Sequence, residues 1–237
     1  MNQRSAGRTA ERPVTMRTIV AASAIGTTIE WYDFLIYATA ASLVLNTLFF
    51  PTHDPLIGKL LAIGTIGVGF FARPLGAIIL SHYGDRLGRK SMLILTLVGM
   101  GVATMLIGLL PTYETIGIAA PILLVACRLV QGIAVGGEWG GAVLMAIEHA
   151  PPEKRGYYGS IVQIGFPLGM ALGTASFFAL AYLDNAQFMS WGWRVPFLAS
   201  ALLVVVGTFI RLRIEETHDV KKNVRESKIV RFRVVGR

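Results

Sequence analysis

Long apolar runs alternate with short polar segments along almost the whole chain. The clearest run, Ser91–Leu110, holds twenty residues without a charge and lies between Lys90 and Pro111. A helix needs about 20 mostly apolar residues to cross the hydrocarbon layer of a bilayer. The pattern predicts an all-α, polytopic membrane protein with six transmembrane helices. The other five predicted spans are Thr18–Phe50, Ile57–Ser81, Pro121–Glu148, Ser160–Leu183 and Val195–Leu212.

The breaks between the runs are short and rich in turn-forming residues. Short connections predict that consecutive helices lie antiparallel beside each other. We divide the chain into a cytoplasmic N-terminal segment (1–17), a six-helix bundle (18–212) and a cytoplasmic tail (213–237) that begins a central loop. The breaks are Pro51 to Pro55, Gly84 to Gly88, Pro111, Pro151-Pro152 and Asp184-Asn185.

Lysine and arginine predict the orientation of the bundle. Eighteen of the 22 basic residues fall in the N-terminal segment, between the second and third spans, between the fourth and fifth spans, or from Arg211 to the end, all on one side of the predicted membrane. The opposite side holds only Lys59 and Arg194. Short loops rich in these residues stay in the cytoplasm during insertion. Both ends are therefore expected in the cytoplasm, which requires an even number of spans.

The composition supports a membrane protein and excludes several other classes. Only 15% of the 237 residues are charged, against about 25% in a soluble domain, and the mean hydropathy is +0.59. The net charge of +8 comes from clusters at the ends of spans, so nucleic acid is not an expected partner. Cys127 is the single cysteine, which excludes an internal disulfide and a CxxC metal or redox site.

No arrangement of residues in the sequence predicts catalysis. No two of the four histidines have the spacing of metal ligands. No serine or cysteine has the context of a nucleophile elbow, and Gly136-Gly137 lacks the preceding strand that a phosphate-binding loop requires. We expect no enzyme activity, no bound metal and no cofactor.

Charged residues inside the first span predict a polar surface within the membrane. An ionised group at mid-bilayer costs roughly 3 kcal/mol or more, so it faces another polar group or water. Glu30, Asp33 and Tyr37 fall within about 60° of helix surface at 100° per residue. Arg73, just before Pro74 in the second span, fits a packing or interfacial role as well as a cavity role.

The fourth span carries a second polar surface that complements the first. Arg128, Gln131, Val135 and Glu138 fall within about 80° of one helix face. An acidic face opposite a face with a cation, an amide and an acid is what a shared polar cavity requires. The alternative is a structural ion pair that only holds two helices together.

The six spans also show a pattern of residue types that extends over three spans and occurs twice. Spans one and four carry charges, spans two and five are rich in glycine, and spans three and six are plain. Two groups of three that enter from opposite sides have the layout of a 3+3 inverted repeat in half a transporter. The alternative is that any six-helix protein can be cut into matching threes.

Two motifs resemble signatures of the major facilitator superfamily. One is the break after the second span, although that superfamily usually has glycine at the position of Ser81. The other is Arg128 to Gly132, which is similar to the fourth-helix motif associated with proton coupling. The first motif reads Gly84-Asp85-Arg86-Leu87-Gly88-Arg89-Lys90.

Finer motifs resemble one branch, the metabolite:proton symporters, which include carriers of shikimate, citrate, α-ketoglutarate and proline or betaine. The resemblance runs from Ala21 to Thr217, nearly the whole chain. Its motifs are Glu30-Trp31-Tyr32-Asp33-Phe34, Arg73-Pro74-Leu75-Gly76, Gly136-Gly137-Glu138-Trp139-Gly140-Gly141 and Trp191-Gly192-Trp193-Arg194-Val195-Pro196-Phe197.

The resemblance implies a function, a location and roles for named residues. It implies proton-coupled symport of a small organic acid or zwitterionic metabolite across the inner membrane, with the solute, protons and lipid bilayer as partners. Asp33 and Arg128 would line the path of substrate and proton, with Glu30, Gln131 and Glu138 near it. A cytoplasmic gate would be formed by Asp85, Arg86 and Arg89; the alternative is a basic turn that only sets topology.

The length of the chain differs from that family. Its members have twelve spans in two six-helix halves, with the path between the halves, and this chain corresponds to the first half. Its last residues, Lys228 to Arg237, do not lead into a seventh span. A frameshifted end, a truncated chain and a gene fragment remain open as explanations. The alternative function is a non-transporting fragment, or a half that needs a second half or another copy of itself.

Overall fold

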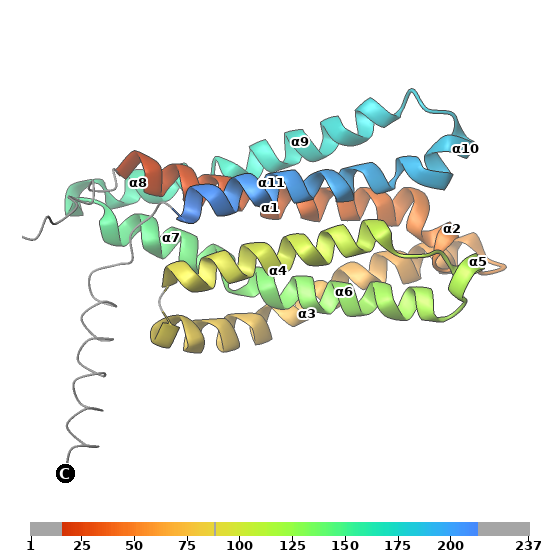
Figure 1. Ribbon diagram of the computed structural model, residues 1–237, viewed down its shortest axis with the longest axis horizontal. Coiled ribbons are helices and arrows are strands. Elements are labelled where there is room, and N and C mark those ends of the chain that lie inside the picture. The colour runs from red at the N-terminus through yellow and green to blue at the C-terminus, as the bar shows by residue number, and fades with distance from the viewer. Residues whose placement is uncertain (1–15, 88, 213–237) are drawn as a thin grey trace, which may run out of the picture.

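The computed structural model describes residues 16–87 and 89–212, and every regular element in those ranges is a helix (Figure 1). The predicted N-terminal segment (1–17) lies outside these ranges except for its last two residues, and the predicted tail (213–237) lies entirely outside them. The first three spans are α1 (Met16–Ala40), continued by a π-helical turn (Ala41–Leu45) and α2 (Asn46–Leu48); α3 (Pro55–Leu87); and α4 (Arg89–Leu109).

The last three spans are each accompanied by a shorter helical piece. The fourth is α6 (Ala119–Gly136) followed by α7 (Glu138–His149), the fifth is α8 (Arg155–Val162) followed by α9 (Gly165–Leu180), and the sixth is α11 (Arg194–Leu212). The connections hold α5 (Tyr113–Ile116), a 3-10 turn (Pro152–Lys154), α10 (Asn185–Gln187) and a π-helical turn (Phe188–Gly192).

Length and apolar character suit these helices to a membrane. Five helical stretches of the described chain are long and apolar enough to cross one. Asn185–Gly192 and Arg194–Ile210, bent by 42° relative to each other, make a sixth when they are taken as one span. The predicted all-helical, six-span architecture is therefore confirmed.

The second span is longer than the sequence predicts. The predicted end at Ser81 is wrong, because α3 continues through Leu87. For the same reason the predicted loop from Gly84 to Gly88 is wrong for most of its length. Gly84 is buried, and a Cβ placed on it would lie 3.6 Å from Cγ of Met92 in α4. Gly84 therefore lies inside a helix, in ordinary contact with its neighbour, rather than in a turn.

The described ends and the connections sort to two ends of the bundle (Figure 1). The start of α1, the α3–α4 junction, the α7–α8 connection and the end of α11 lie at one end, and α2, α5 and α10 lie at the other. The first end is the one that the basic residues assign to the cytoplasm.

Cysteine labelling tests that assignment. In a Cys127→Ser background, Asn185→Cys should react with a membrane-impermeant maleimide in intact cells, because position 185 lies at the end that is poor in basic residues. Lys154→Cys should react only after the cells are opened, since basic loops are held in the cytoplasm. Labelling of both positions from one side would contradict the six-span topology.

The closest helix pairs cross between the two groups of three spans. α9 packs against α1, α6 against α3, and α11 against α4. In span order these pairs are five with one, four with two, and six with three. An operation that exchanges spans one to three with spans four to six swaps the first two pairs and returns the third to itself. The packing therefore has the pairing symmetry of a 3+3 inverted repeat.

Glycines make the two equivalent crossings close. A Cβ on Gly169 of α9 would lie 2.5 Å from the carbonyl oxygen of Thr28 in α1. At the other crossing, a Cβ on Gly136 of α6 would overlap the carbonyl oxygen of Arg73 in α3. At both places one helix lies directly on the backbone of the other, which leaves no room for a side chain.

The motif before the sixth span fastens α11 to α4. Arg194 donates hydrogen bonds to the carbonyl oxygens of Gly108 and Leu110 at the end of α4, at 2.6 and 2.8 Å. Its guanidinium also lies 4.6 Å from the ring centre of Trp193, which is buried edge-on against Phe197. These last carbonyls of a helix lack partners within the helix, so an arginine satisfies them well.

Candidate transport pocket

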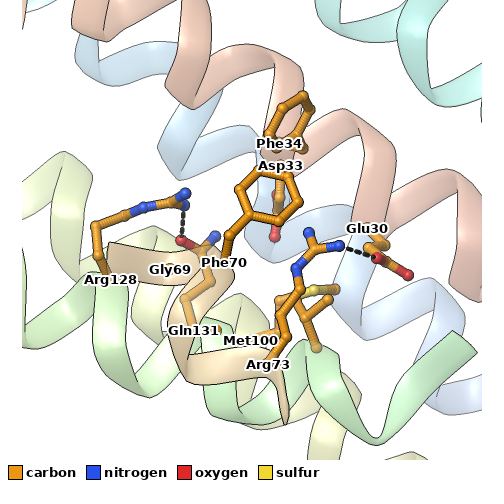
Figure 2. A pocket seen from close by; sticks show the side chains of 11 residues that line it. Glu30, Asp33, Phe34, Gly69, Phe70, Arg73, Met100, Arg128 and Gln131 are labelled. Carbon is orange, nitrogen blue, oxygen red and sulfur yellow. Dashed lines mark hydrogen bonds and ion pairs between the residues drawn. The ribbon is translucent and has the colours of Figure 1, made fainter. Parts of the chain in front are cut away.

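A small pocket that is open on one side lies between α1, α3, α4 and α6 (Figure 2). It combines acids, guanidinium groups, one amide and two aromatic rings within spans that are otherwise apolar. Its lining residues are Glu30, Asp33, Phe34, Gly69, Phe70, Arg73, Met100, Arg128, Gln131, Gly132 and Val135.

The two polar faces expected from the sequence meet in this pocket. α1 contributes Glu30 and Asp33, and α6 contributes Arg128 and Gln131. All four side chains are buried, with at most 5% of their surface exposed. The helical period of α1 and α6 places each pair on one face, and the close α3–α6 crossing turns the α6 face toward α1.

Arg128 is held by an aromatic ring and an amide. Its guanidinium lies 3.9 Å from the ring centre of Tyr37, and it donates a hydrogen bond to Oε1 of Gln131. The Tyr37 hydroxyl is in turn 2.5 Å from Oγ1 of Thr65 in α3. Nε of Arg128 is buried and has no hydrogen-bond partner among the described residues. The cation is therefore fixed in place without a direct carboxylate partner.

Asp33 is linked to Arg128 through two neutral side chains. Nε2 of Gln131 donates to Oγ1 of Thr104 at 2.7 Å, and Thr104 donates to Oδ2 of Asp33, also at 2.7 Å. The other carboxylate oxygen of Asp33 is buried and has no hydrogen-bond partner in the described part of the chain. Thr104 lies in α4, the span that the sequence marks as plain, and its importance is not visible in the sequence pattern.

The rim of the pocket holds a second, looser pair of charges. Arg73 Nη1 lies 3.5 Å from Oε1 of Glu30, and 29% of the Arg73 side chain is exposed. The guanidinium of Arg73 is also 4.5 Å from the ring centre of Phe70, which meets Phe34 edge-on at 5.6 Å. Figure 2 shows Arg73 between Glu30 and the two rings. The structure thus places Arg73, whose role the sequence leaves open, in the pocket wall.

Glu138 does not line this pocket. The fourth span breaks at Gly137, and Glu138 begins α7 rather than continuing α6. Its buried carboxylate accepts a hydrogen bond from Thr96 of α4 at 3.0 Å. The continuous polar face predicted from Arg128 to Glu138 is interrupted because the helical phase is lost at the break.

Two of the three predicted gate residues cannot be placed. Arg86 is exposed near the end of α3, whereas the side chains of Asp85 and Arg89 lie outside the described part of the structure. Within the described residues, no group of three or more histidine, cysteine, aspartate or glutamate side chains is arranged to hold a metal ion.

The fold defines the class of protein first. Over 90% of this chain, the bundle superposes with a TM-score of 0.75 on 55% of the inward-open xylose transporter XylE from E. coli, at 16% identity. A crystal structure of a D-xylose-proton symporter gives 0.77 over 94% of this chain and 53% of that one, also at 16% identity. The described chain has the fold of half a transporter of the major facilitator superfamily.

Sequence comparison then identifies the family: residues 18–229 match the sugar (and other) transporter family, and the chain belongs to it. It is 48% identical over 222 residues to the inner membrane metabolite transport protein YhjE of Escherichia coli K12, covering 93% of this chain and 50% of that protein. Over 198 residues it is 50% identical to the shikimate transporter of the same strain, covering 83% and 45%.

A third relative, the proline/betaine transporter of Escherichia coli K12, is 39% identical over 210 residues, which are 88% of this chain and 42% of that protein. The chain spans about half the length of the curated relatives it matches. Its family and relatives are membrane transporters and not enzymes, so the predicted resemblance to the major facilitator metabolite carriers is confirmed.

Proposed function

We propose that this chain is the N-terminal half of a proton-coupled symporter for a small organic acid or zwitterionic metabolite. In this proposal residues 18–212 form the transport bundle in the inner membrane, with both ends in the cytoplasm. The observation that carries the proposal is a buried pocket in which one carboxylate, Asp33, is joined to one guanidinium, Arg128, by neutral hydrogen-bonding side chains.

The charges of the pocket suggest how a proton and a solute are coupled. Glu30 and Asp33 balance Arg73 and Arg128, so the empty pocket is neutral when all four are ionised. Binding of one proton by Asp33 leaves a surplus positive charge, which in a water-poor site strongly favours an anionic group of the solute. Release of the solute into the cytoplasm then favours loss of the proton, because the carboxylate again balances Arg128.

The pocket offers the solute charged side chains on one side and aromatic rings on the other. A guanidinium binds a carboxylate with two parallel hydrogen bonds, and Arg73 is the more exposed of the two cations of the pocket. Phe34 and Phe70 form an apolar wall next to it. These features suit a small molecule that carries a carboxylate on a compact apolar or hydroxylated frame.

The relatives support a path shared between two halves. They are about twice as long as this chain, and carriers of this architecture alternate access by rocking one bundle against another. We therefore propose that the pocket faces a second six-helix half, or a second copy of this chain. Asp85, Arg86 and Arg89 are proposed to form a gate at the cytoplasmic end. The alternative is a chain that inserts but takes no part in transport.

Uptake measurements test the proposal. The chain is purified alone and also joined to the C-terminal half of the Escherichia coli shikimate transporter, with the native shikimate transporter as positive control. In proteoliposomes with an inward proton gradient, the joined protein should accumulate labelled shikimate, and a proton ionophore should remove that accumulation. Accumulation that persists with the ionophore would contradict proton coupling.

The chain alone should take up none of labelled shikimate, citrate, α-ketoglutarate or betaine, since alternating access requires a second bundle to rock against the first. Gradient-dependent uptake of any of them by the chain alone would contradict the need for a different second half. It would identify a pair of identical chains as the carrier.

A further inference from the structure

The direction of the hydrogen bonds between Arg128 and Asp33 follows from the chemistry of the side chains. A guanidinium can only donate, so Gln131 must turn its oxygen toward Arg128 and its NH₂ group toward Thr104. The Thr104 oxygen therefore accepts from Gln131, and its single proton is left to donate to Asp33. Each donor polarises the next, and the sequence of bonds ends on the carboxylate.

Thr104 has a second acceptor within reach. Its Oγ1 lies 2.7 Å from Oδ2 of Asp33 and 3.0 Å from the carbonyl oxygen of Met100, one turn earlier in α4. One hydroxyl proton cannot occupy both bonds fully. While Asp33 is ionised, the stronger, charge-assisted bond to the carboxylate holds the proton. Once Asp33 is protonated, its own O–H can donate to the Thr104 oxygen, and the threonine proton turns to Met100.

The side chains that make these bonds are buried. Thr104 is fully buried, and Asp33, Gln131 and Arg128 are exposed by 1%, 3% and 5%. No direct ion pair joins Asp33 to Arg128 in the described part of the chain. Thr104 and Gln131 are thus the hydrogen-bonded connection between the two charges.

We propose that Thr104 is the positioning residue that transmits the protonation state of Asp33 to Gln131 and Arg128. The inference rests on the proposed role of Asp33 in proton coupling. A proton from solution binds the Asp33 carboxylate, and the threonine keeps its own proton and only rotates it between two acceptors. With the threonine proton on Met100, Gln131 no longer donates into a bond that ends on a negative charge, so its hold on Arg128 weakens. Arg128 is then more available to an anionic solute.

The charged and titratable neighbours of Asp33 are few. Glu30, Tyr32 and Tyr37 share its helix, Arg73 faces it from α3, and Arg128 faces it from α6. α9 contains no charged residue, and those of α4 and α11 lie near the helix ends. Of the remaining elements packed against α1, α7 carries Glu138, which is bonded to Thr96, and ends with Glu148 and His149. α8 carries Arg155, Tyr157 and Tyr158.

Infrared spectroscopy of the purified chain in lipid vesicles tests this role without any transport. The carbonyl stretch of protonated Asp33 is followed from about pH 4 to about pH 9 and assigned by its loss in Asp33→Asn. Thr104→Val keeps the shape of the side chain and removes the donor. A donor that bonds the ionised carboxylate favours the charged form, so its removal favours binding of the proton. The midpoint of the Asp33 band should therefore rise by about one pH unit.

Two matched variants separate this role from a general effect on packing. Thr104→Ser, which keeps the hydroxyl, should restore the wild-type midpoint. Thr96→Val removes a buried hydroxyl from the same helix, but one that is bonded to Glu138 outside the pocket, and it should leave the Asp33 midpoint unchanged. Circular dichroism checks that each variant is folded, and Thr104→Ala replaces the valine variant if that one fails to fold.

The outcomes distinguish the role of Thr104 from proton binding by Asp33. A wild-type midpoint in folded Thr104→Val or Thr104→Ala would overturn the role of Thr104 and leave the proposed function intact. Failure of Thr104→Ser to restore the midpoint would overturn it as well. A carboxylate at position 33 that does not titrate anywhere in this range would overturn proton binding by Asp33 itself, and with it the proposed coupling.

Discussion

Asp33→Asn and Arg128→Ala should each abolish proton-driven accumulation by the protein in which this chain is joined to a second half. Asparagine cannot bind and release a proton, so the variant should still exchange labelled for unlabelled solute but no longer concentrate it. Arg128→Ala should lose exchange as well, because it removes a buried cation that attracts the anionic group of the solute. Charge interactions are strong in a water-poor site, so we expect uptake to decrease by at least about 100-fold.

The measurement is initial uptake and solute exchange in proteoliposomes over a range of pH. Asp184→Asn is a suitable control, because it makes the same chemical change at an exposed acid outside the pocket. Immunoblotting confirms that each variant inserts at the same level. Normal accumulation with normal pH dependence in both pocket variants would contradict the assignment of Asp33 and Arg128 to the proton path.

Gly169→Leu should destabilise the bundle. A Cβ at this position would lie 2.5 Å from the carbonyl oxygen of Thr28, 2.7 Å from Cβ of Trp31 and 2.9 Å from the backbone nitrogen of Tyr32. Two of these three atoms belong to the backbone of α1 and cannot turn away as a long side chain can. Forcing a larger side chain into such a contact costs about 3 kcal/mol. The free energy of unfolding in mixed detergent micelles, followed by circular dichroism, should fall by that amount.

Gly64→Leu provides the matched comparison for this variant. Gly64 also lies within a membrane-spanning helix, but nothing lies within 4 Å of a Cβ placed there. The substitution should therefore leave the free energy of unfolding nearly unchanged. Equal destabilisation by the two variants would show that the chemistry of the change matters more than its position at the α1–α9 crossing.

The sequence predicts the features that depend on regular spacing. Hydrophobic length locates the six spans, and the helical period places Glu30 and Asp33 on one face and Arg128 and Gln131 on another. The structure brings these four residues into a single pocket. Both steps succeed because a charge inside a membrane has few low-energy positions other than a polar interior.

Other features depend on contacts that a single sequence does not display. Thr104 is one threonine in an apolar span, and such residues often bond only to their own helix. Its role appears only when α4 is placed between α1 and α6. The sequence continues one helical face from Arg128 to Glu138, whereas the structure begins a new helix, α7, after Gly137. Gly84 reads as a turn residue, whereas the structure places it inside α3, beside Met92 of α4.

The crossed pairing of the helices has a consequence for how the chain is made. α1 leaves the ribosome first, yet the helix that covers its backbone most closely, α9, belongs to the fifth span. The closest partner of α3 is likewise a later helix, α6 of the fourth span. The first three spans therefore contain none of their own closest partners, which lie in spans four, five and six. We expect the bundle to complete its packing only after the fifth and sixth spans have entered the membrane.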